Sequence, residues 1–315
     1  MRLAAVLSCT LLLVSMQGCA HNNSSKDSFS GRGDVFEKQM ERQNALEAAD
    51  MESSLPEIEM TAASYEEMGD YSFKKGDPMQ AYLQYSKALR SDEENARIHY
   101  KLGLVFLKRS LPDDAYREFT FVAEREPENA LAVLGMGRAR FLESDYAEAE
   151  QFFRKALELD EGTWRAHNFL CVINNRRQQY DKALSDFNAA ILLRPKSGML
   201  YNNLGVSYMM KGDCEKAVKA FSKAIALGGE KGRAYNNLGV SLARLGEMDK
   251  AFEAFRAGVG EAEAYNNLGY LYLVRGDYRQ AVEALEKAVQ KNPSYYTKAY
   301  ENLNSAKSAL EEVSR

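Results

Sequence analysis

A spacing of 34 residues recurs along most of this chain of 315 residues. One small residue marks each period, and these residues are Gly69, Gly103, Gly137, Cys171, Gly205, Gly239 and Gly269. Five of the intervals between them are 34 residues long and the last is 30. A period of this length corresponds to one supersecondary unit, which cannot bury its apolar face alone and must stack on its neighbours. The repeat therefore predicts an array of stacked units rather than a fold around one central core.

Two further residue types keep the same register within each unit. An alanine follows the small residue by twelve positions, at 81, 115, 149, 183, 217, 251 and 281. A large apolar residue follows four positions later, as Tyr85, Phe119, Phe153, Phe187, Phe221, Phe255 and Leu285. Turns such as Lys75-Gly76-Asp77-Pro78 divide each unit into two helices, because glycine can end one helix in the left-handed conformation and aspartate can cap the next. The small residues are expected where these two helices approach closely, and a larger side chain there would cost about 1–3 kcal/mol.

This pattern of small residue, alanine, aromatic residue and closing proline resembles the tetratricopeptide repeat (TPR). The resemblance implies an all-α fold: a right-handed TPR solenoid of about seven helix-turn-helix repeats over residues 62–295. Units are expected to begin near residues 62, 96, 130, 164, 198, 232 and 262. Residues 296–315 place apolar side chains at helical spacing and are expected to form a C-terminal capping helix. The sixth unit is four residues short, so a clipped second helix and a local change of curvature are expected there.

The amino-terminal residues have the layout of a secretory signal. Arg2 precedes a largely apolar run from Leu3 to Val14, which is shorter than the roughly 20 residues that span a bilayer. The run is followed by Ser15-Met16-Gln17-Gly18-Cys19, and this ending, a small residue followed by cysteine, resembles the lipobox of bacterial lipoproteins. The resemblance implies a signal peptide over residues 1–18, cleavage before Cys19, and several acyl chains on Cys19 that hold the protein on the membrane. The alternative is an ordinary secretory peptide in which Cys19 is incidental.

The residues from Cys19 onward indicate where the protein is sorted and how the repeats are attached to the membrane. Ala20 resembles the signal that sorts lipoproteins to the outer membrane, facing the periplasm. Residues 19–61 begin with a polar stretch rich in serine and glycine, which is typical of a flexible tether. A short helix capped by Asp34 and running to Asp50 is expected within this tether.

Composition and residue placement argue against an enzyme. The net charge is −4 without a basic tract, so no nucleic-acid partner is expected, and the four cysteines form no CxxC pair. Two of the three histidines, His99 and His167, occupy the same position of units two periods apart and cannot share a metal. Cys171 and Cys214 are expected to be free thiols. No nucleophile–histidine–acid set or phosphate-binding loop occurs, so no catalytic site, metal or cofactor is expected.

A binding groove is the remaining candidate site. At 100° per residue, positions 2, 5, 6, 9 and 13 of each unit lie opposite the buried stripe of its first helix, on the side that stacked repeats turn inward. The candidate groove residues are Asn203, Asn237, Asn267, Arg165, Arg176, Arg233, Arg244 and Tyr270. Asparagine at position 6 resembles peptide-binding TPR arrays, in which the amide contacts the ligand backbone, and its removal is expected to cost little folding energy. Equally, Tyr-Asn-Asn-Leu-Gly is common TPR consensus whatever the array binds. No unit carries both the lysine at position 5 and the asparagine at position 9 of the chaperone-binding clamp.

Signal, lipobox, tether and repeats together resemble the assembly lipoproteins of type IV and tight-adherence (Flp) pili. The resemblance implies a non-enzymatic, lipid-anchored adaptor that binds protein partners through its groove and assists a secretin or pilus component. One alternative is a scaffold for peptidoglycan hydrolases. Another is an accessory subunit of an envelope enzyme, which would require a catalytic constellation that the sequence does not supply.

Overall fold

The computed structural model describes residues 38, 40–42, 61–292 and 297–314. The predicted signal peptide, Cys19 and nearly all of the predicted tether and its short helix lie outside these residues. Met40 is described, and it packs against the apolar core formed by the first repeats. No strand occurs in the described residues, which confirms the all-α prediction.

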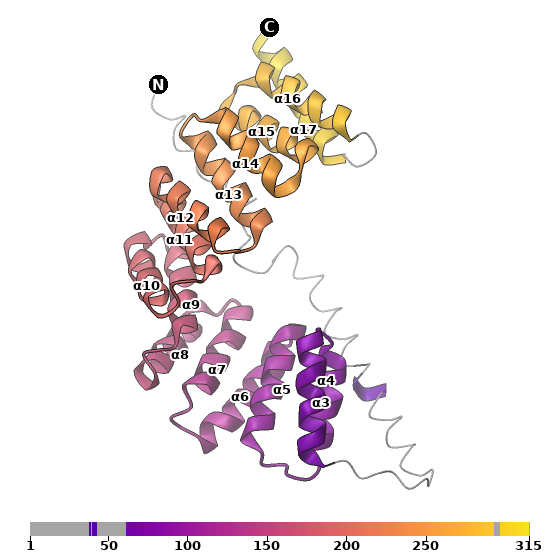
Figure 1. The fold of residues 1–315 in the computed structure, drawn as a ribbon, viewed down its shortest axis with the longest axis vertical. Helices are drawn as coiled ribbons and strands as arrows, with labels where there is room; N and C mark the ends of the chain where they lie inside the picture. Colours follow the sequence, from indigo (N-terminus) through magenta and orange to yellow (C-terminus); the bar gives the residue numbers. More distant parts are fainter. Residues whose placement is uncertain (1–37, 39, 43–60, 293–296, 315) are drawn as a thin grey trace. The chain divides into compact units, whose positions relative to one another are not determined.

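Seven helix pairs and one terminal helix follow the predicted period (Figure 1). The pairs are α3 (Ala62–Lys75) with α4 (Pro78–Leu89), α5 (Ala96–Arg109) with α6 (Pro112–Arg125), α7 (Ala130–Leu142) with α8 (Tyr146–Leu159), α9 (Trp164–Arg176) with α10 (Tyr180–Leu193), α11 (Gly198–Lys211) with α12 (Cys214–Ala226), α13 (Lys231–Arg244) with α14 (Met248–Val259), and α15 (Glu261–Arg275) with α16 (Tyr278–Lys291). The terminal helix is α17 (Thr297–Ser314), which packs on α16 and α15. The fold is therefore the predicted TPR solenoid.

The chain divides into two compact units, with the boundary inside α9. Among the described residues, one unit ends at residue 173 and the other holds residues 174–292 and 297–314. Within each unit, the second helix of a pair packs against the first helix of the next pair, and successive first helices also contact one another, as α5 does α7 and α11 does α13. We call α3, α5, α7 and the start of α9 the first-helix layer of residues 61–173. The first-helix layer of residues 174–315 consists of α11, α13, α15 and α17.

The small and aromatic positions meet within each helix pair. A Cβ placed on Gly69 would lie 2.4 Å from the ring of Tyr85, and one on Gly239 would lie 2.5 Å from the ring of Phe255. Such distances are shorter than any ordinary carbon contact, so the backbone of the first helix rests directly on the ring of the second. The rings themselves are fully buried. The predicted reason for the small residues is confirmed.

The predicted turn chemistry, a left-handed glycine followed by a capping aspartate, holds in two of the turns inside the pairs and not in several others. Gly76 and Gly212 end their helices with φ of 89° and 93°, in the left-handed region that favours glycine. The side chains of Asp77 and Asp213 accept hydrogen bonds from the backbone N–H of Gln80 and Lys216. Asp277 precedes α16 without such a bond, so the predicted cap is absent there.

The sixth unit is shorter than the others mainly in the connection that follows its second helix. Helix α14 has 12 residues, close to the 13 of α12, whereas Gly260 alone separates α14 from α15. Gly260 adopts φ 92° and ψ 171°, a conformation that is essentially restricted to glycine. The expected clipped helix is thus correct only in part, because the helix is nearly complete and the loop is shortened.

The two cysteines in the described part of the chain form no disulfide. Cys171 is buried and its thiol donates to the carbonyl oxygen of His167 at 2.9 Å, while Cys214 is partly exposed; both are free thiols, as predicted. None of the helices in the described ranges combines the length and the apolar character needed to cross a bilayer.

Candidate functional site

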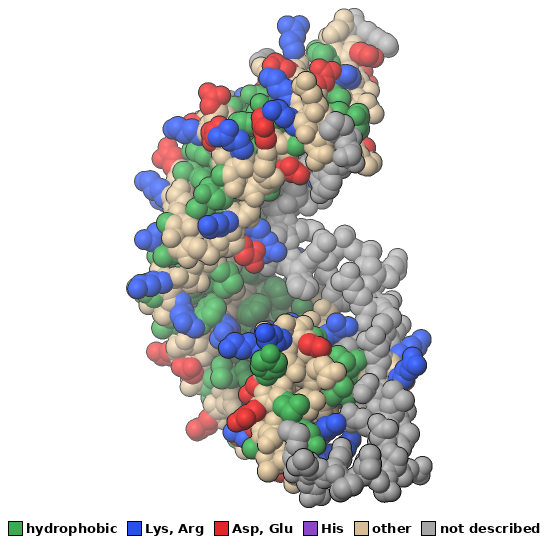
Figure 2. Space-filling view, turned by 45° about the vertical axis from the view of Figure 1, so that its right-hand side comes forward, with side chains coloured by type: hydrophobic (Ala, Val, Ile, Leu, Met, Phe, Trp, Pro, Cys, Tyr) green, Lys and Arg blue, Asp and Glu red, His purple; other side chains and the backbone are tan. Residues whose placement is uncertain are grey.

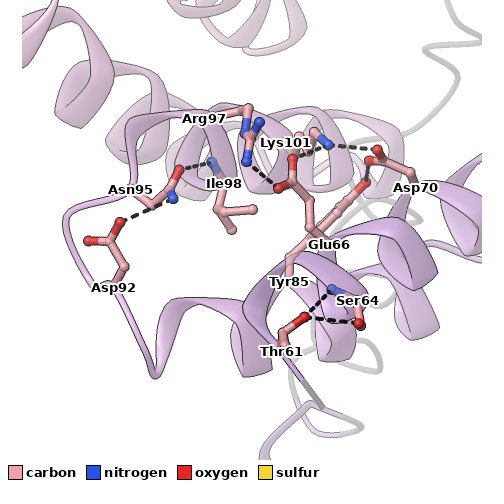
Figure 3. A network of polar contacts seen from close by, with 10 residues as sticks. All are labelled: Thr61, Ser64, Glu66, Asp70, Tyr85, Asp92, Asn95, Arg97, Ile98 and Lys101. Atoms are coloured by element: carbon pink, nitrogen blue, oxygen red, sulfur yellow. Dashed lines mark hydrogen bonds and ion pairs between the residues drawn. The ribbon is translucent and has the colours of Figure 1, made fainter.

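A network of charged side chains joins the first two members of the first-helix layer (Figure 3). Glu66 of α3 is buried, and its carboxylate forms ion pairs with Arg97 Nη2 and Lys101 Nζ of α5, each at an N···O distance of 2.6 Å. Lys101 also contacts Asp70 at 2.7 Å, and the hydroxyl of Tyr85 donates to Asp70 at 2.7 Å. Burial, and then the hydrogen bond to Asp70, raise the pKa of Tyr85 far above its ordinary value. Positions 5 and 9 of the first repeat are therefore paired with positions 2 and 6 of the second.

An asparagine ladder joins the first-helix layer of residues 174–315. The amide Nδ2 of Asn237 donates to Oδ1 of Asn202 at 3.1 Å, and that of Asn267 donates to Oδ1 of Asn236 at 3.1 Å. Asn302 of the terminal helix continues the series by donating to Asn266 at 3.0 Å. Each rung connects position 6 of one repeat, or its counterpart in α17, to position 5 of the repeat before.

The ladder changes one expectation about the predicted groove amides. Asn237 and Asn267 each donate one amide hydrogen to the first helix of the preceding repeat. Replacing either residue therefore removes a hydrogen bond between repeats. Asn203 is only 8% exposed, and its Oδ1 accepts from Asn202 at 3.4 Å. Besides the bond of the ladder, Asn237 and Asn267 each carry a second amide hydrogen and a carbonyl oxygen, groups with which an asparagine can bind another partner. Peptide binding by these amides stays a prediction.

Three predicted arginines lie in the same unit as the ladder. Arg244 is exposed, and its Nη1 donates to the backbone oxygen of Met209 on the preceding first helix at 3.2 Å. Arg233 forms an ion pair with Glu230 at 3.0 Å, and Arg176 is exposed at the end of α9. The half-buried Tyr270 lies on α15, on the same helix as two ladder residues. Arg233, Arg244 and Tyr270 lie with the ladder in the first-helix layer of residues 174–315, whereas Arg176 lies on α9.

The predicted Arg165 belongs to the unit that ends at residue 173, and there the structure reveals two neighbours that sequence reasoning missed. Its guanidinium lies over the ring of Trp164, 4.7 Å from the ring centroid. Tyr100 of α5 and Arg138 of α7 interact electrostatically with it and with each other. Burial raises the pKa of Tyr100 and lowers the pKa of Arg138. A signal was present in the sequence, because position 9 carries arginine only in the third unit.

The chemistry of the described residues is that of recognition. No group of three or more His, Cys, Asp or Glu side chains among them is arranged to hold a metal ion. Acidic and basic side chains are interspersed over the face shown in Figure 2, with apolar side chains between them. In residues 174–315, partly exposed Val206, Met210 and Val274 stand in the same helix layer as the ladder. Such a layer offers apolar contacts, amides and guanidinium groups to another polypeptide.

Comparisons with known proteins agree with this architecture. Tetratricopeptide repeat models match residues 100–163, 175–229, 202–266 and 262–295, and a TPR repeat model matches residues 69–109. The chain is 25% identical over 187 residues to anaphase-promoting complex subunit 3 of Schizosaccharomyces pombe, which covers 58% of this chain and 27% of that protein. It is 25% identical over 162 residues to TPR repeat-containing protein MJ1428 of Methanocaldococcus jannaschii, covering 44% of this chain and 29% of the other. The chain thus spans less than a third of either relative.

Solved structures share the fold at low identity. The Cut9–Hcn1 tetramer of the anaphase-promoting complex matches with a TM-score of 0.59 and 20% identity, over 90% of this chain and 56% of the other. PilF of Pseudomonas aeruginosa matches with a TM-score of 0.53 and 22% identity, over 68% of this chain and 98% of the other. Repeats of this kind act as scaffolds for protein interactions. With repeat models covering more than half of its length, the chain belongs to the tetratricopeptide repeat family.

Proposed function

We propose that this protein is a non-enzymatic adaptor, anchored by lipid to the periplasmic face of the bacterial outer membrane, that binds a protein partner through its first-helix layer. The observation that carries the proposal is the row of seven repeats itself, since this family acts by binding proteins. Its first helices carry apolar side chains, amides and arginines, and some of these amides also hydrogen-bond to a neighbouring first helix.

The envelope assignment is supported by the amino-terminal sequence. An apolar run from Leu3 to Val14 that is soon followed by Gly18-Cys19 fits a lipoprotein signal, and the polar stretch after Cys19 fits a tether between membrane and repeats. Several acyl chains would hold the protein stably, because each buried CH₂ contributes about 0.8 kcal/mol. The combination with TPR units supports a role in assembling a pilus or its secretin.

Replacing the lipidated residue tests the anchor. In Cys19→Ala we expect an uncleaved precursor that incorporates no radiolabelled palmitate, because the acyl acceptor is missing. The measurement is palmitate labelling and membrane fractionation of wild type and variant, with Cys214→Ala as the control that removes a different thiol. Normal processing and labelling of Cys19→Ala would contradict the lipoprotein assignment.

Crosslinking in the native envelope, followed by identification of the captured proteins, tests the role. Capture of a secretin or pilus component supports the proposal, whereas capture of peptidoglycan hydrolases supports the alternative scaffold. If no protein is enriched over a lipid-anchored control without repeats, the adaptor proposal fails.

A further inference from the structure

Leu83 of α4 is buried at a position that the later repeats expose to water. It stands at position 22 of the first repeat and is only 3% exposed. Position 22 is exposed in each later repeat, where its residues are Arg117, Gln151, Ser185, Lys219, Glu253 and Glu283. The exposed fraction of the side chain is 75% for Arg117 and 66% for Glu283. An apolar residue thus replaces a polar one in the repeat where this position is shielded from water.

Contacts between the repeats do not account for this burial. Helix α4 packs on α3 of its own pair and on α5 of the next, as α6, α12 and α14 pack on the corresponding helices around them. These contacts leave position 22 exposed in the later repeats, so they face other sides of the second helix. The burial of Leu83 is that of a single chain. Its cover is therefore a segment of the same chain outside the periodic packing.

Met40 identifies a segment that fits. Residues 40–42 are helical and precede the first repeat. Met40 is partly buried and packs against the apolar core of the first repeats, as Tyr82 of α4 does, whereas Lys38 and Arg42 are exposed. In Figure 1 this helical turn lies on the side of α4 away from α5. The turn therefore directs an apolar side chain to the repeats and charged side chains to water, as an amphipathic segment docked on a protein does.

We propose that the segment around Met40 is an arm that docks on α4 and covers Leu83. Hydrophobic burial drives the contact, because Met40 and Leu83 both leave water when the arm is in place. The leucine at position 22 has this purpose, since the later repeats form the same helix pair with a polar residue there. The docking surface lies on a second helix and is separate from the first-helix layer that is proposed to bind partners.

The docked arm sets how far the first repeat can move from a membrane anchor, a consequence that rests on the proposed function. The end-to-end distance of a flexible chain is about 5–6 Å times the square root of its number of residues. A flexible spacer from Cys19 to Lys38 would span about 20–25 Å, whereas one from Cys19 to Ala62 would span about 30–40 Å. Docking thus shortens the spacer and joins its end to α4.

Trypsin cleavage of the purified full chain tests the docking without a membrane or a partner. Trypsin cuts after lysine and arginine in segments that open locally, and Lys38 and Arg42 provide two sites within the arm. We expect Leu83→Glu to accelerate cleavage at these two sites at least about tenfold, because a buried charge opposes docking of the arm. Cleavage after Arg32, which precedes the arm, should stay within about twofold of the wild-type rate.

Two further variants exclude damage to α4 as the cause. Glutamate already stands at position 22 in the sixth and seventh repeats, so the helix pair tolerates it. Leu83→Met should keep the arm protected, because methionine is apolar and of similar volume. Ser185→Glu adds the same charge at position 22 of the fourth repeat and should leave cleavage within the arm unchanged. Wild-type rates of cleavage after Lys38 and Arg42 in Leu83→Glu would overturn the proposal.

Alkylation of a thiol at position 83 tests the contact from the other side. In Leu83→Cys we expect slow reaction with N-ethylmaleimide. Adding Met40→Glu should accelerate the reaction at least about tenfold, because the thiol loses its cover. The partly exposed Cys214 of α12 is the internal reference and should react at the same rate in both proteins. An equal rate at position 83 with and without Met40→Glu would mean that the arm does not cover Leu83.

Dilution separates the arm from a second copy of the chain as the cover. An intramolecular contact does not depend on protein concentration, whereas a contact between two copies is lost on dilution. We expect the same protection of Lys38 and Arg42 from trypsin at every concentration, and loss of protection on dilution would overturn the proposal. These measurements involve neither lipidation nor partner capture. Failure of the docking therefore leaves the adaptor function standing, and failure of the adaptor function leaves the docking standing.

Discussion

The backbone of α11 at Gly205 lies so close to the ring of Phe221 that a Cβ would stand 2.6 Å from the ring. The ring is fully buried, and the same contact recurs in the next repeat between Gly239 and Phe255. Protein interiors are close-packed, so a methyl group added here must displace the ring or the helix. Gly232, on α13, differs because a Cβ there would meet its nearest atom at 3.5 Å, an ordinary contact distance.

These two glycines allow a matched comparison. Gly205→Ala should lower the free energy of unfolding by about 1–3 kcal/mol, because the added methyl overpacks the contact with Phe221. Gly232→Ala should change it little or raise it by about 0.4–1 kcal/mol, since alanine restricts the unfolded chain and meets no obstacle. Urea denaturation followed by circular dichroism measures both. A greater loss in Gly232→Ala would show that the close approach at Gly205 is not what requires glycine.

Helices are the level at which the sequence was most informative. The period of 34 residues predicted every helix pair, and α5, α7, α9 and α11 begin at the expected residues. The helical period also placed Asn202 and Asn237 opposite the buried stripe of their helices. Which of these side chains pair could not be predicted, because pairing depends on the offset between successive first helices. Helical spacing within one repeat does not determine that offset, so the asparagine ladder became visible only in the structure.

A double-mutant cycle on Asn202 and Asn237 measures one rung of the ladder. We expect each single alanine variant to lose stability, and the double variant to lose less than the sum of the two, because one hydrogen bond is removed in all three. The coupling free energy should be about 0.5–1.5 kcal/mol. Urea denaturation of the four proteins provides the values. Additive effects would mean that the rung contributes nothing to holding α11 and α13 together.

Each of the two units is held together, in the residues that the structure describes, by contacts between neighbouring helices. Its apolar clusters each draw on a few successive repeats: one centres on Tyr85 and Phe119, and another on Phe221 and Phe255. In arrays of this kind, stability is approximately a sum of repeat terms and nearest-neighbour terms. A local defect should therefore weaken the repeats around it and leave distant repeats protected.

Hydrogen exchange of two matched variants tests this locality. Phe119→Ala removes a fully buried ring from the core that includes α5 and α6, and Phe255→Ala removes its equivalent from the core around α13 and α14. Each should cost about 3–5 kcal/mol, because a large cavity replaces the ring. Mass spectrometry should show faster exchange in α5 and α6 with unchanged exchange in α15 and α16 for Phe119→Ala. Phe255→Ala should accelerate exchange in α13 and α14 and leave α3 and α4 protected. Uniform acceleration in either variant would show that the array unfolds as one cooperative body.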